Sequence, residues 1–362
     1  MEYYFNVIEK FIMKKQLVEY PINIQDKVEY CLQDGKRLRP ILCIIFSGIE
    51  INNDLDINNK IIYTIASLIE KIHCLSLVLD DLPEMDNDIL RRGKQSFHSK
   101  YGVEYTNFFI YYMFTQIGLS LDIILDSINN SNADSVVDIV TYNVTDSVAD
   151  SVADTNNIKY DIKIFCKIKD LFTVNLNMLI DGQYDDCNFF LKSQLAHNEE
   201  NIEIKENNLS QFKYEIDIIL KFLEIDNFEK LIIENIKLNM KKTSSLFHLS
   251  ICSGFLLQLW KNKYELENYN YIYEKIKIWS NILGYMFQIS DDILDIYNDK
   301  EKGNPNLCNI IGKENTCTIL KKGCKWLIEN IKNIIRESNM ILELNVYVIN
   351  KLIVNINKRS EL

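Results

Sequence analysis

The sequence is short of glycine, proline and paired cysteines, and each shortage excludes a class of protein. With 11 Gly and 4 Pro in 362 residues, it has too few turn-forming residues for an architecture of many short strands. Its nine Cys are scattered singly, with no Cys-x-x-Cys and no paired Cys/His spacing. We therefore expect reduced thiols rather than disulfides or zinc, and a cytoplasmic location.

The chain also lacks an excess of positive charge, because 51 Asp and Glu outnumber 40 Lys and Arg. The net charge of −11 argues against a nucleic-acid partner. No apolar run reaches the ~18–20 residues that a membrane span requires, and the N-terminal residues indicate an amphipathic helix rather than a cleavable signal. Hydrophobic residues make up 47% of the chain, which is enough for a sizeable core.

Apolar residues recur at helical spacing along most of the chain, and no stretch alternates convincingly like a strand. Two regions lack the helical pattern and are interpreted as insertions: a low-complexity one at about 126–157 and a polar one at about 193–212. We predict an all-α fold and one domain spanning residues 1–362. The expected helices cover residues 3–20, 24–33, 41–49, 58–82, 103–125, 158–190, 213–225, 228–240, 243–260, 271–297 and much of 317–358.

An acidic stretch with two arginines follows the apolar helix expected at 58–82. Crowded carboxylates raise each other's pKa and lose solvation, so a divalent cation such as Mg2+ would relieve both costs, while guanidinium groups suit phosphate oxygens. Pro83 should break the helix, because six unbroken residues would turn by about 240° and separate Asp80 from Asp86. The stretch predicts a metal-bridged diphosphate site. Its charged members are Asp80, Asp81, Asp86, Asp88, Arg91 and Arg92.

A second acidic cluster lies near the end of the helix expected at 271–297. The spacing of Asp291, Asp292 and Asp295 predicts three carboxylates on one side of an apolar helix. For this cluster alone, an exposed acidic helix end is the alternative. Two such clusters facing each other across a cavity would hold several cations and a diphosphate, and would stabilise charge on a departing diphosphate.

Six motifs in order along most of the chain resemble those of the trans-isoprenyl diphosphate synthases of the geranylgeranyl/farnesyl diphosphate synthase type. In the loop motif, Asp34 replaces the family's first glycine. The resemblance implies an isoprenoid-synthase-type helical bundle around a central apolar cavity, and a homodimer. The motifs are the loop Asp34–Pro40, the segment Glu70–Leu77, the first aspartate-rich motif Asp80–Gly93, the pair Gly182-Gln183, the pair Lys242-Thr243, and the second aspartate-rich motif Gly284–Asp295.

The resemblance implies Mg2+-assisted ionisation, condensation and elimination, in which isopentenyl diphosphate adds to dimethylallyl, geranyl or farnesyl diphosphate. It implies three Mg2+ ions, with Asp80, Asp86 and Asp291 as main ligands and Asp81, Asp292 and Asp295 in supporting roles. The remaining implied roles divide between the two substrates. The allylic diphosphate is assigned to Arg91, Lys242 and Gln288, the carbocation to Thr243 or Gln288, and isopentenyl diphosphate to Lys36, Arg39, His73, Arg92 and, as a remnant of a downstream segment, Lys302.

Product length should depend on Leu75 and Ser76, the fifth and fourth residues before the first motif. In relatives an aromatic residue at the fifth position closes the tunnel at fifteen carbons, so the smaller Leu75 favours a product of twenty carbons or more, with geranylgeranyl diphosphate as the leading candidate. The bulky Phe108, Tyr111 and Tyr112 oppose much longer products, or else pack in the core or at a dimer interface.

Three alternatives remain open. The first is a medium-chain or loosely specific polyprenyl diphosphate synthase. The second is a regulatory subunit of the same fold, although such proteins usually lose an aspartate-rich motif and this chain keeps both. The third is a terpene cyclase, which needs no isopentenyl site and so would leave the matching set of Lys, Arg and His unexplained.

Overall fold

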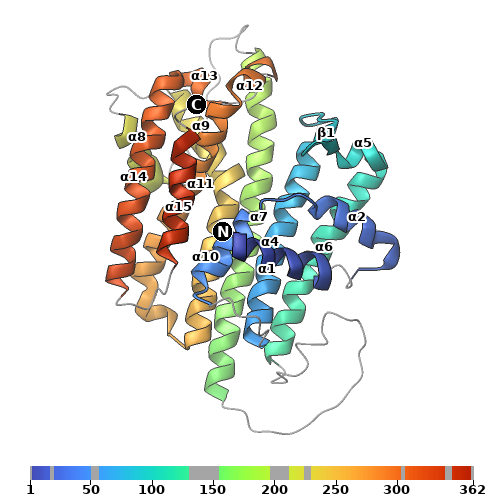
Figure 1. Cartoon of the computed structure of the whole chain (residues 1–362), viewed down its shortest axis with the longest axis vertical. Coiled ribbons are helices and arrows are strands. Elements are labelled where there is room, and N and C mark those ends of the chain that lie inside the picture. The colour runs from blue at the N-terminus through green and yellow to red at the C-terminus, as the bar shows by residue number, and fades with distance from the viewer. Residues whose placement is uncertain are drawn as a thin grey trace. The chain divides into compact units, whose positions relative to one another are not determined.

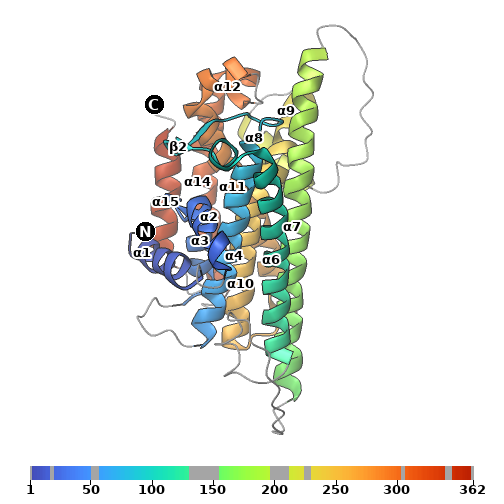
Figure 2. The same ribbon diagram turned by 90° about the vertical axis from the view of Figure 1, so that its right-hand side faces the viewer.

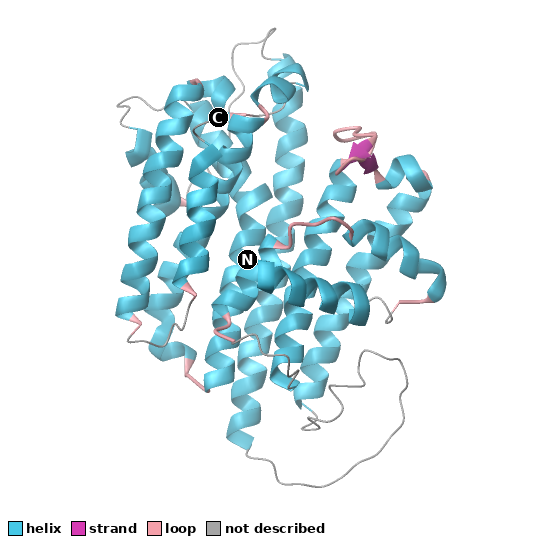
Figure 3. Ribbon diagram, viewed as in Figure 1, coloured by secondary structure: helices cyan, strands magenta, loops and turns pink. Residues whose placement is uncertain are grey.

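A computed structural model describes residues 2–16, 20–49, 57–129, 155–195, 212–223, 230–302, 306–338 and 345–359. Nearly all of these residues are helical (Figure 3), which confirms the predicted all-α fold. The two predicted insertions lie mostly outside the described residues. Their described edges, 126–129, 155–157 and 193–195, belong to helices rather than loops.

The chain divides into two compact units, and each is described by itself. Unit 1 holds Met1–Leu171 and Ser253–Leu266, and unit 2 holds Phe172–Cys252 and Glu267–Leu362. The division falls inside two helices, α7 (Thr155–Leu195) and α10 (Ser245–Asn262). The single domain expected from the sequence stays a prediction.

Unit 1 is built around α4 (Ile57–Asp80), which packs against α3 (Leu38–Phe46) and α6 (Val103–Asn129) (Figures 1 and 2). Residues of α4 at helical spacing, from Ile61 through Ile65 and Leu68 to Leu75, are fully or almost fully buried, as the apolar periodicity predicts. The elements are α1 (Glu2–Lys10), the π-helix η1 (Phe11–Gln16), α2 (Ile22–Leu32), α3 (Leu38–Phe46), α4 (Ile57–Asp80), β1 (Leu90–Arg91), β2 (Lys94–Gln95), α5 (Phe97–Tyr101) and α6 (Val103–Asn129).

The two short strands form a hairpin that the apolar pattern did not predict. Leu90 pairs with Gln95 and Arg91 with Lys94. The chain reverses through Arg92 and Gly93, which have φ values of 53° and 76°. Two positive φ values in a two-residue loop suit the right-handed twist of a hairpin, so the Arg-Gly pair of the first motif makes a tight turn.

Unit 2 is organised on α11 (Asn270–Leu294), which packs along α14 (Lys313–Glu337) (Figures 1 and 2). A Cβ on Gly323 of α14 would collide with the side chain of Met286, so this glycine permits the close helix contact. Helix α14 also packs on α15 and α8. The elements outside α7 and α10 are α8 (Lys213–Leu223), α9 (Lys230–Asn239), the π-helix η5 (Met240–Ser244), the 3-10 helix η6 (Leu266–Tyr269), α11 (Asn270–Leu294), α12 (Ile296–Lys302), α13 (Leu307–Ile311), α14 (Lys313–Glu337) and α15 (Val346–Lys358).

Two helices are long and apolar enough to cross a membrane by length and composition, so the expectation that no stretch reaches that length is corrected. They are Asn59–Asp80, within α4, and Val103–Ile128, within α6. The first is mostly buried inside the protein, as a core helix would be. Length and composition alone do not establish that either helix spans a membrane.

Candidate active site

The first aspartate-rich motif begins at the last residue of α4 and continues into a loop that returns to the helix end. The backbone N–H of Asp86 donates to the carbonyl of Asp80 at 2.9 Å. The helix therefore breaks before Pro83, as predicted, and the loop brings Asp86 back beside Asp80. Both residues are half-buried, which leaves their carboxylates within reach of solvent.

Asp81 behaves differently from its neighbour. It is 2% exposed and forms an ion pair with Arg91, whose Nε lies 2.8 Å from its Oδ1. Burial raises the pKa of Asp81, and the bond to Arg91 opposes that rise. Arg91 also contacts Asp88, with 3.4 Å between Nη2 and Oδ2. The arginine assigned to the allylic diphosphate therefore already neutralises carboxylates of the first motif.

The loop Asp34–Pro40 depends on a left-handed backbone conformation at two positions, because φ is 60° at Asp34 and 51° at Arg37. Glycine adopts this region freely, and Asp is among the side chains that tolerate it. The replacement of the family's first glycine by Asp34 is thus compatible with the loop. Gly35 is more restricted, because a Cβ there would meet the side chains of Arg37 and Glu70.

Arg37 is the most constrained cation of this loop, and the motif-based assignment passed over it. Its side chain is fully buried and donates to the carbonyl of Leu32 at 2.5 Å, to Glu70 at 2.9 Å and to Glu9 at 2.6 Å. Because a buried charge needs such partners, these bonds fix the loop that carries Arg39. The sequence did offer a signal for Arg37, because it is one of three cations in the loop that resembles the family motif.

His73 lies where several arginines converge. Nη1 of Arg39 is 3.2 Å from Nε2 of His73. Since a guanidinium can only donate, Nε2 is the acceptor and the imidazole is neutral. Burial, followed by the charges of Arg39, Arg92, Arg37 and Arg91, lowers the pKa of His73 well below its usual value. The predicted residues His73, Arg39 and Arg92 are therefore gathered into a positive cluster, whose role in substrate binding stays a prediction.

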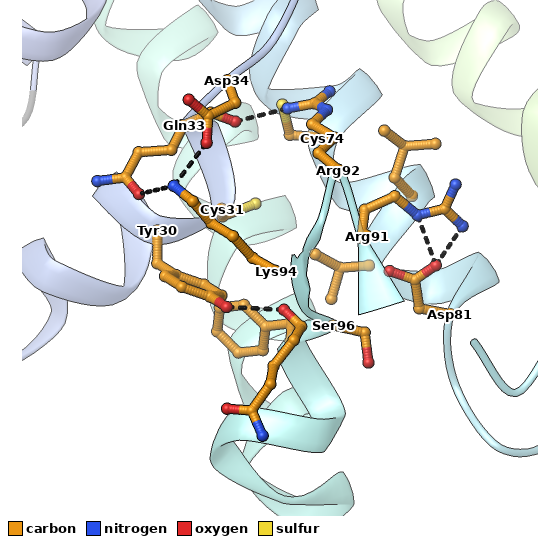
Figure 4. A pocket seen from close by; sticks show the side chains of 14 residues that line it. Tyr30, Cys31, Gln33, Asp34, Cys74, Asp81, Arg91, Arg92, Lys94 and Ser96 are labelled. Carbon is orange, nitrogen blue, oxygen red and sulfur yellow. Dashed lines mark hydrogen bonds and ion pairs between the residues drawn. The ribbon is translucent and has the colours of Figure 1, made fainter. Parts of the chain in front are cut away.

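A pocket opens between α2, α4 and the β1–β2 hairpin (Figure 4). Arg92 Nη1 donates to the carbonyl of Gln33 at 2.7 Å, and Lys94 pairs with Asp34 at 2.5 Å, so the hairpin is tied to the end of α2. Four residues of this unit are assigned to isopentenyl diphosphate, and one of them, Arg92, lines the pocket. Lys36 is exposed on the loop. The lining residues that carry charge are Asp34, Asp81, Arg91, Arg92 and Lys94.

In the second motif, the adjacent aspartates lie in different surroundings. Asp291 is half-buried, whereas Asp292 is 2% exposed. The Asp292 carboxylate accepts from the N–H of Leu307 and from Nε2 of Gln288, both at 2.9 Å. Burial raises the pKa of Asp292 to about 7, although these two bonds oppose the rise. Asp295 follows the last residue of α11 and is exposed, so the structure separates Asp292 from the other two carboxylates.

Asp291 has a cationic partner that no sequence motif indicated. Arg359, which follows the last residue of α15, forms an ion pair with the Asp291 carboxylate and donates to Oγ of Ser290 at 3.0 Å. Its guanidinium also lies 5.3 Å from the ring centroid of Phe287. Sequence spacing cannot reveal such a contact, because the two residues are 68 positions apart.

The Lys242-Thr243 pair lies on the π-helix η5. A Cβ on Gly182 would come within 2.7 Å of the Lys242 backbone N, and a Cβ on Gly284 within 2.6 Å of the Ser244 Cα. The glycines of two separate family motifs therefore allow the backbone of η5 to approach α7 and α11. π-helical turns occur frequently at functional sites, which fits the assignment of Lys242 and Thr243.

Polar contacts extend from η5 to the second motif. Nζ of Lys242 lies 2.5 Å from Oδ2 of Asp186, a residue that the sequence analysis did not assign. Thr243 Oγ1 donates to Gln288 Oε1 at 2.6 Å, and Gln288 in turn donates to Asp292. Three predicted site residues are thus joined in one hydrogen-bonded chain.

The residues assigned to product length differ in burial. Leu75 is fully buried, and Ser76 Oγ donates to the carbonyl of His73 at 2.8 Å. In contrast, Phe108 and Tyr111 of α6 are 73% and 69% exposed. They are surface residues in this chain, so packing in its core is excluded for both.

The aspartate oxygens have the chemistry that Mg2+ prefers, because hard cations take carboxylate ligands. The half-buried or exposed carboxylates of Asp80, Asp86, Asp291 and Asp295 fit that donor type. Within the described ranges, no group of three or more His, Cys, Asp or Glu side chains is gathered closely enough to hold an ion. The two motifs belong to different units, and the side chain of Lys302 lies outside the description.

Solved structures identify the class of fold. The geranyltranstransferase of Thermotoga maritima superposes with a TM-score of 0.59 at 17% identity, covering 98% of each chain. A geranyltransferase of Helicobacter pylori, solved with magnesium and isoprenyl diphosphate, gives 0.61 at 19% identity over 97% of this chain and 96% of that one. The chain therefore has the all-α isoprenoid-synthase fold.

The polyprenyl synthetase family model matches residues 22–207 and 221–338, so this protein belongs to that family. It is 27% identical to the geranylgeranyl diphosphate synthase of Cyanophora paradoxa over 321 residues, 86% of this chain and 80% of that protein. It is 39% identical to a chloroplastic geranylgeranyl pyrophosphate synthase of Catharanthus roseus over 102 residues, which span about a quarter of each protein (27% and 26%). The resemblance found in the motifs is confirmed.

Proposed function

We propose that this protein is a trans-prenyltransferase that condenses isopentenyl diphosphate with an allylic diphosphate to give geranylgeranyl diphosphate. The observation that carries the proposal is the cluster of Arg39, His73 and Arg92, which concentrates positive charge in the unit that also holds Asp80 and Asp86. Family membership and the geranylgeranyl diphosphate synthases among its relatives support it.

The isopentenyl substrate is assigned to the cluster around His73. Arg39 and Arg92 would donate to its diphosphate, and Lys36 on the exposed loop would add a third cation. The neutral imidazole of His73 accepts from Arg39 at Nε2 and so carries its proton on Nδ1, from which it can donate to an anion. Arg37 would act through the loop, by holding the backbone beside Arg39.

The allylic diphosphate is assigned to Arg91 and Lys242. Each is paired with a carboxylate in this structure, Arg91 with Asp81 and Lys242 with Asp186, so a diphosphate would share or replace these partners. Gln288 would add a polar contact, and Thr243 would present an oxygen dipole to the developing cation. The proton lost from the condensed product would pass to the departing diphosphate.

Mg2+ is the proposed cofactor, with Asp80, Asp86 and Asp291 as its main ligands and three ions expected from the family. When bound, it would neutralise diphosphate oxygens and stabilise charge on the leaving group. Asp81 and Asp292 are buried and bonded within the protein, so we assign them supporting roles. We place the exposed Asp295 with them, in water-mediated contact.

We propose geranylgeranyl diphosphate as the main product because Leu75, and not an aromatic residue, precedes the first motif by five positions. Leu75→Phe should shorten the product if this residue limits chain growth. Leu75→Met, which nearly conserves volume, is the control and should leave product length unchanged. A product distribution that is the same in Leu75→Phe as in the native protein would remove Leu75 from this role.

We propose that the protein acts as a homodimer in the cytoplasm. The exposed aromatic side chains of α6, Tyr105, Phe108 and Tyr111, recur at helical spacing on one face, and aromatic residues are enriched at interfaces. The nine cysteines are free thiols, as expected in a reducing compartment. Light scattering of the native protein and of Phe108→Asp would test the dimer, which the substitution should weaken.

The decisive experiment incubates the purified protein with Mg2+, isopentenyl diphosphate and dimethylallyl, geranyl or farnesyl diphosphate in turn. Products sized by chromatography should extend to twenty carbons. Elongation that stops well beyond twenty carbons would favour a medium-chain synthase. Failure with every primer would refute the synthase, and recovery only on adding another prenyl synthase would indicate a regulatory subunit.

A further inference from the structure

Arg359 places a positive charge on the carboxylate that we assign to Mg2+ in the second motif. It pairs with Asp291 and is held there by the hydroxyl of Ser290, at 3.0 Å, and by the ring of Phe287. All three partners lie on α11, while Arg359 follows the last residue of α15. The guanidinium of Arg359 therefore links the end of α15 to the motif, in addition to the packing of α15 on α14 and α11.

Solvent reaches both partners of this ion pair, so the pair can dissociate readily. The side chains of Arg359 and Asp291 are 22% and 35% exposed, so both charges can return to water at small cost. Ion pairs with such solvent access contribute little to stability. In the first motif the arginine instead pairs with the buried Asp81. The two motifs thus place their arginine on different members of the aspartate pair.

We propose that Arg359 is a resident cation that competes with Mg2+ for Asp291, so that metal binding releases the end of α15 from the second motif. The proposal rests on the proposed function, because it takes Asp291 as a Mg2+ ligand. A guanidinium and Mg2+ both need the carboxylate oxygens, and a guanidinium that stays on Oδ1 repels an incoming divalent cation. Arg359 is then a regulatory residue, which sets the Mg2+ concentration at which the second motif fills.

Reciprocity makes the proposal testable without catalysis. If the seated Arg359 weakens Mg2+ binding, then Mg2+ must weaken the seating of Arg359 by the same factor. The last turn of α15 should therefore exchange its backbone amides faster when Mg2+ is added. This readout needs neither substrate nor turnover.

The test is a calorimetric Mg2+ titration of the full chain without substrate. Arg359→Gln should bind Mg2+ about two- to fivefold more tightly than the native protein, as expected for removal of one solvent-accessible ion pair. Arg359→Lys should lie between them, because it keeps the charge but loses the planar fork. Arg336→Gln is the matched control, since Arg336 near the end of α14 bonds to Asn333 and not to a motif, and it should titrate like the native protein.

Hydrogen exchange supplies the second measurement. Mg2+ should speed exchange over residues 355–359 in the native protein and should have no effect there in Arg359→Gln. Equal or weaker Mg2+ binding by Arg359→Gln would overturn the proposal, as would unchanged exchange of α15 in the native protein.

The variant Asp291→Asn separates this inference from the function beneath it. If Asp291→Asn weakens Mg2+ binding while Arg359→Gln leaves it unchanged, the competition is refuted and the metal site stands. If Asp291→Asn leaves the titration unchanged, Asp291 is not a ligand and both statements fail, although chain elongation by the native protein would still support a prenyltransferase.

Discussion

The two aspartate-rich motifs use the same Asp-Asp pair in different settings. Asp80 and Asp81 lie where α4 ends and a loop begins, whereas Asp291 and Asp292 lie within the last turn of α11. In each pair the first aspartate is half-buried and the second is 2% exposed. Adjacent residues on a helix are about 100° apart, so one of the pair turns inward while the other keeps access to solvent.

The two buried aspartates differ in the groups that stabilise their carboxylates. Asp81 is paired with the charged Arg91, whereas Asp292 accepts from two uncharged donors, the N–H of Leu307 and the amide of Gln288. Neutral donors stabilise a carboxylate less than a guanidinium does, and burial raises the pKa of Asp292 to about 7 although both donors oppose the rise. The same residue types in two motifs therefore do not imply the same electrostatic environment.

The largest expected effect tests the half-buried aspartates. Asp80→Asn and Asp291→Asn should each lower kcat by about 10²–10³-fold, the usual cost of removing one group that stabilises transition-state charge. Thermal unfolding should change little, because neither side chain is fully buried. Steady-state product formation with Mg2+ checks the first expectation and calorimetry the second. Normal turnover in one variant would show that the motifs do not share the same role.

A second prediction concerns unit 2 and the pH dependence of its stability through His248. Burial, with a smaller effect of Lys277, lowers the pKa of His248 to about 4, and its Nδ1 lies 3.0 Å from Asn175. At His248 the unfolded state then binds more protons than the folded state between pH ~4 and ~6.5, so the contribution of His248 to stability is complete above this window and falls as the pH drops through it. The full loss is about 3 kcal/mol.

Urea unfolding from pH 7 to pH 4 measures this effect. His248→Gln should be less stable at pH 7, and the loss of stability on acidification from pH 6.5 to 4 should be smaller by the His248 contribution. A native slope that the substitution leaves unaltered would show that another group controls acid unfolding.

The smallest effect separates the two buried aspartates. Asp292→Ala would leave the donors from Leu307 and Gln288 without their acceptor, at a cost of about 2 kcal/mol. Asp81→Ala should cost about 1 kcal/mol, because the half-buried Arg91 can turn to water or to Asp88. Urea unfolding in the presence of a chelator would measure both, and equal losses would remove the distinction between the two settings.

Much of the architecture followed from local patterns. The apolar periodicity of α4 and the break before Pro83 were predicted, because side-chain spacing and the steric limits of proline act over a few residues. The return of Asp86 to Asp80 followed from that break. The β1–β2 hairpin was missed because two-residue strands carry no periodic signal.

By itself the sequence determined the helices, the order of the motifs and the family to which they belong. Only the tertiary structure decided that Asp81 and Asp292 are buried, and that Arg359 reaches Asp291 across 68 positions. The physical reason is the range of each interaction. Helix periodicity and backbone sterics depend on near neighbours, whereas burial and ion pairing depend on which distant helices pack together, and that sets which half of each Asp-Asp pair remains accessible to a metal ion.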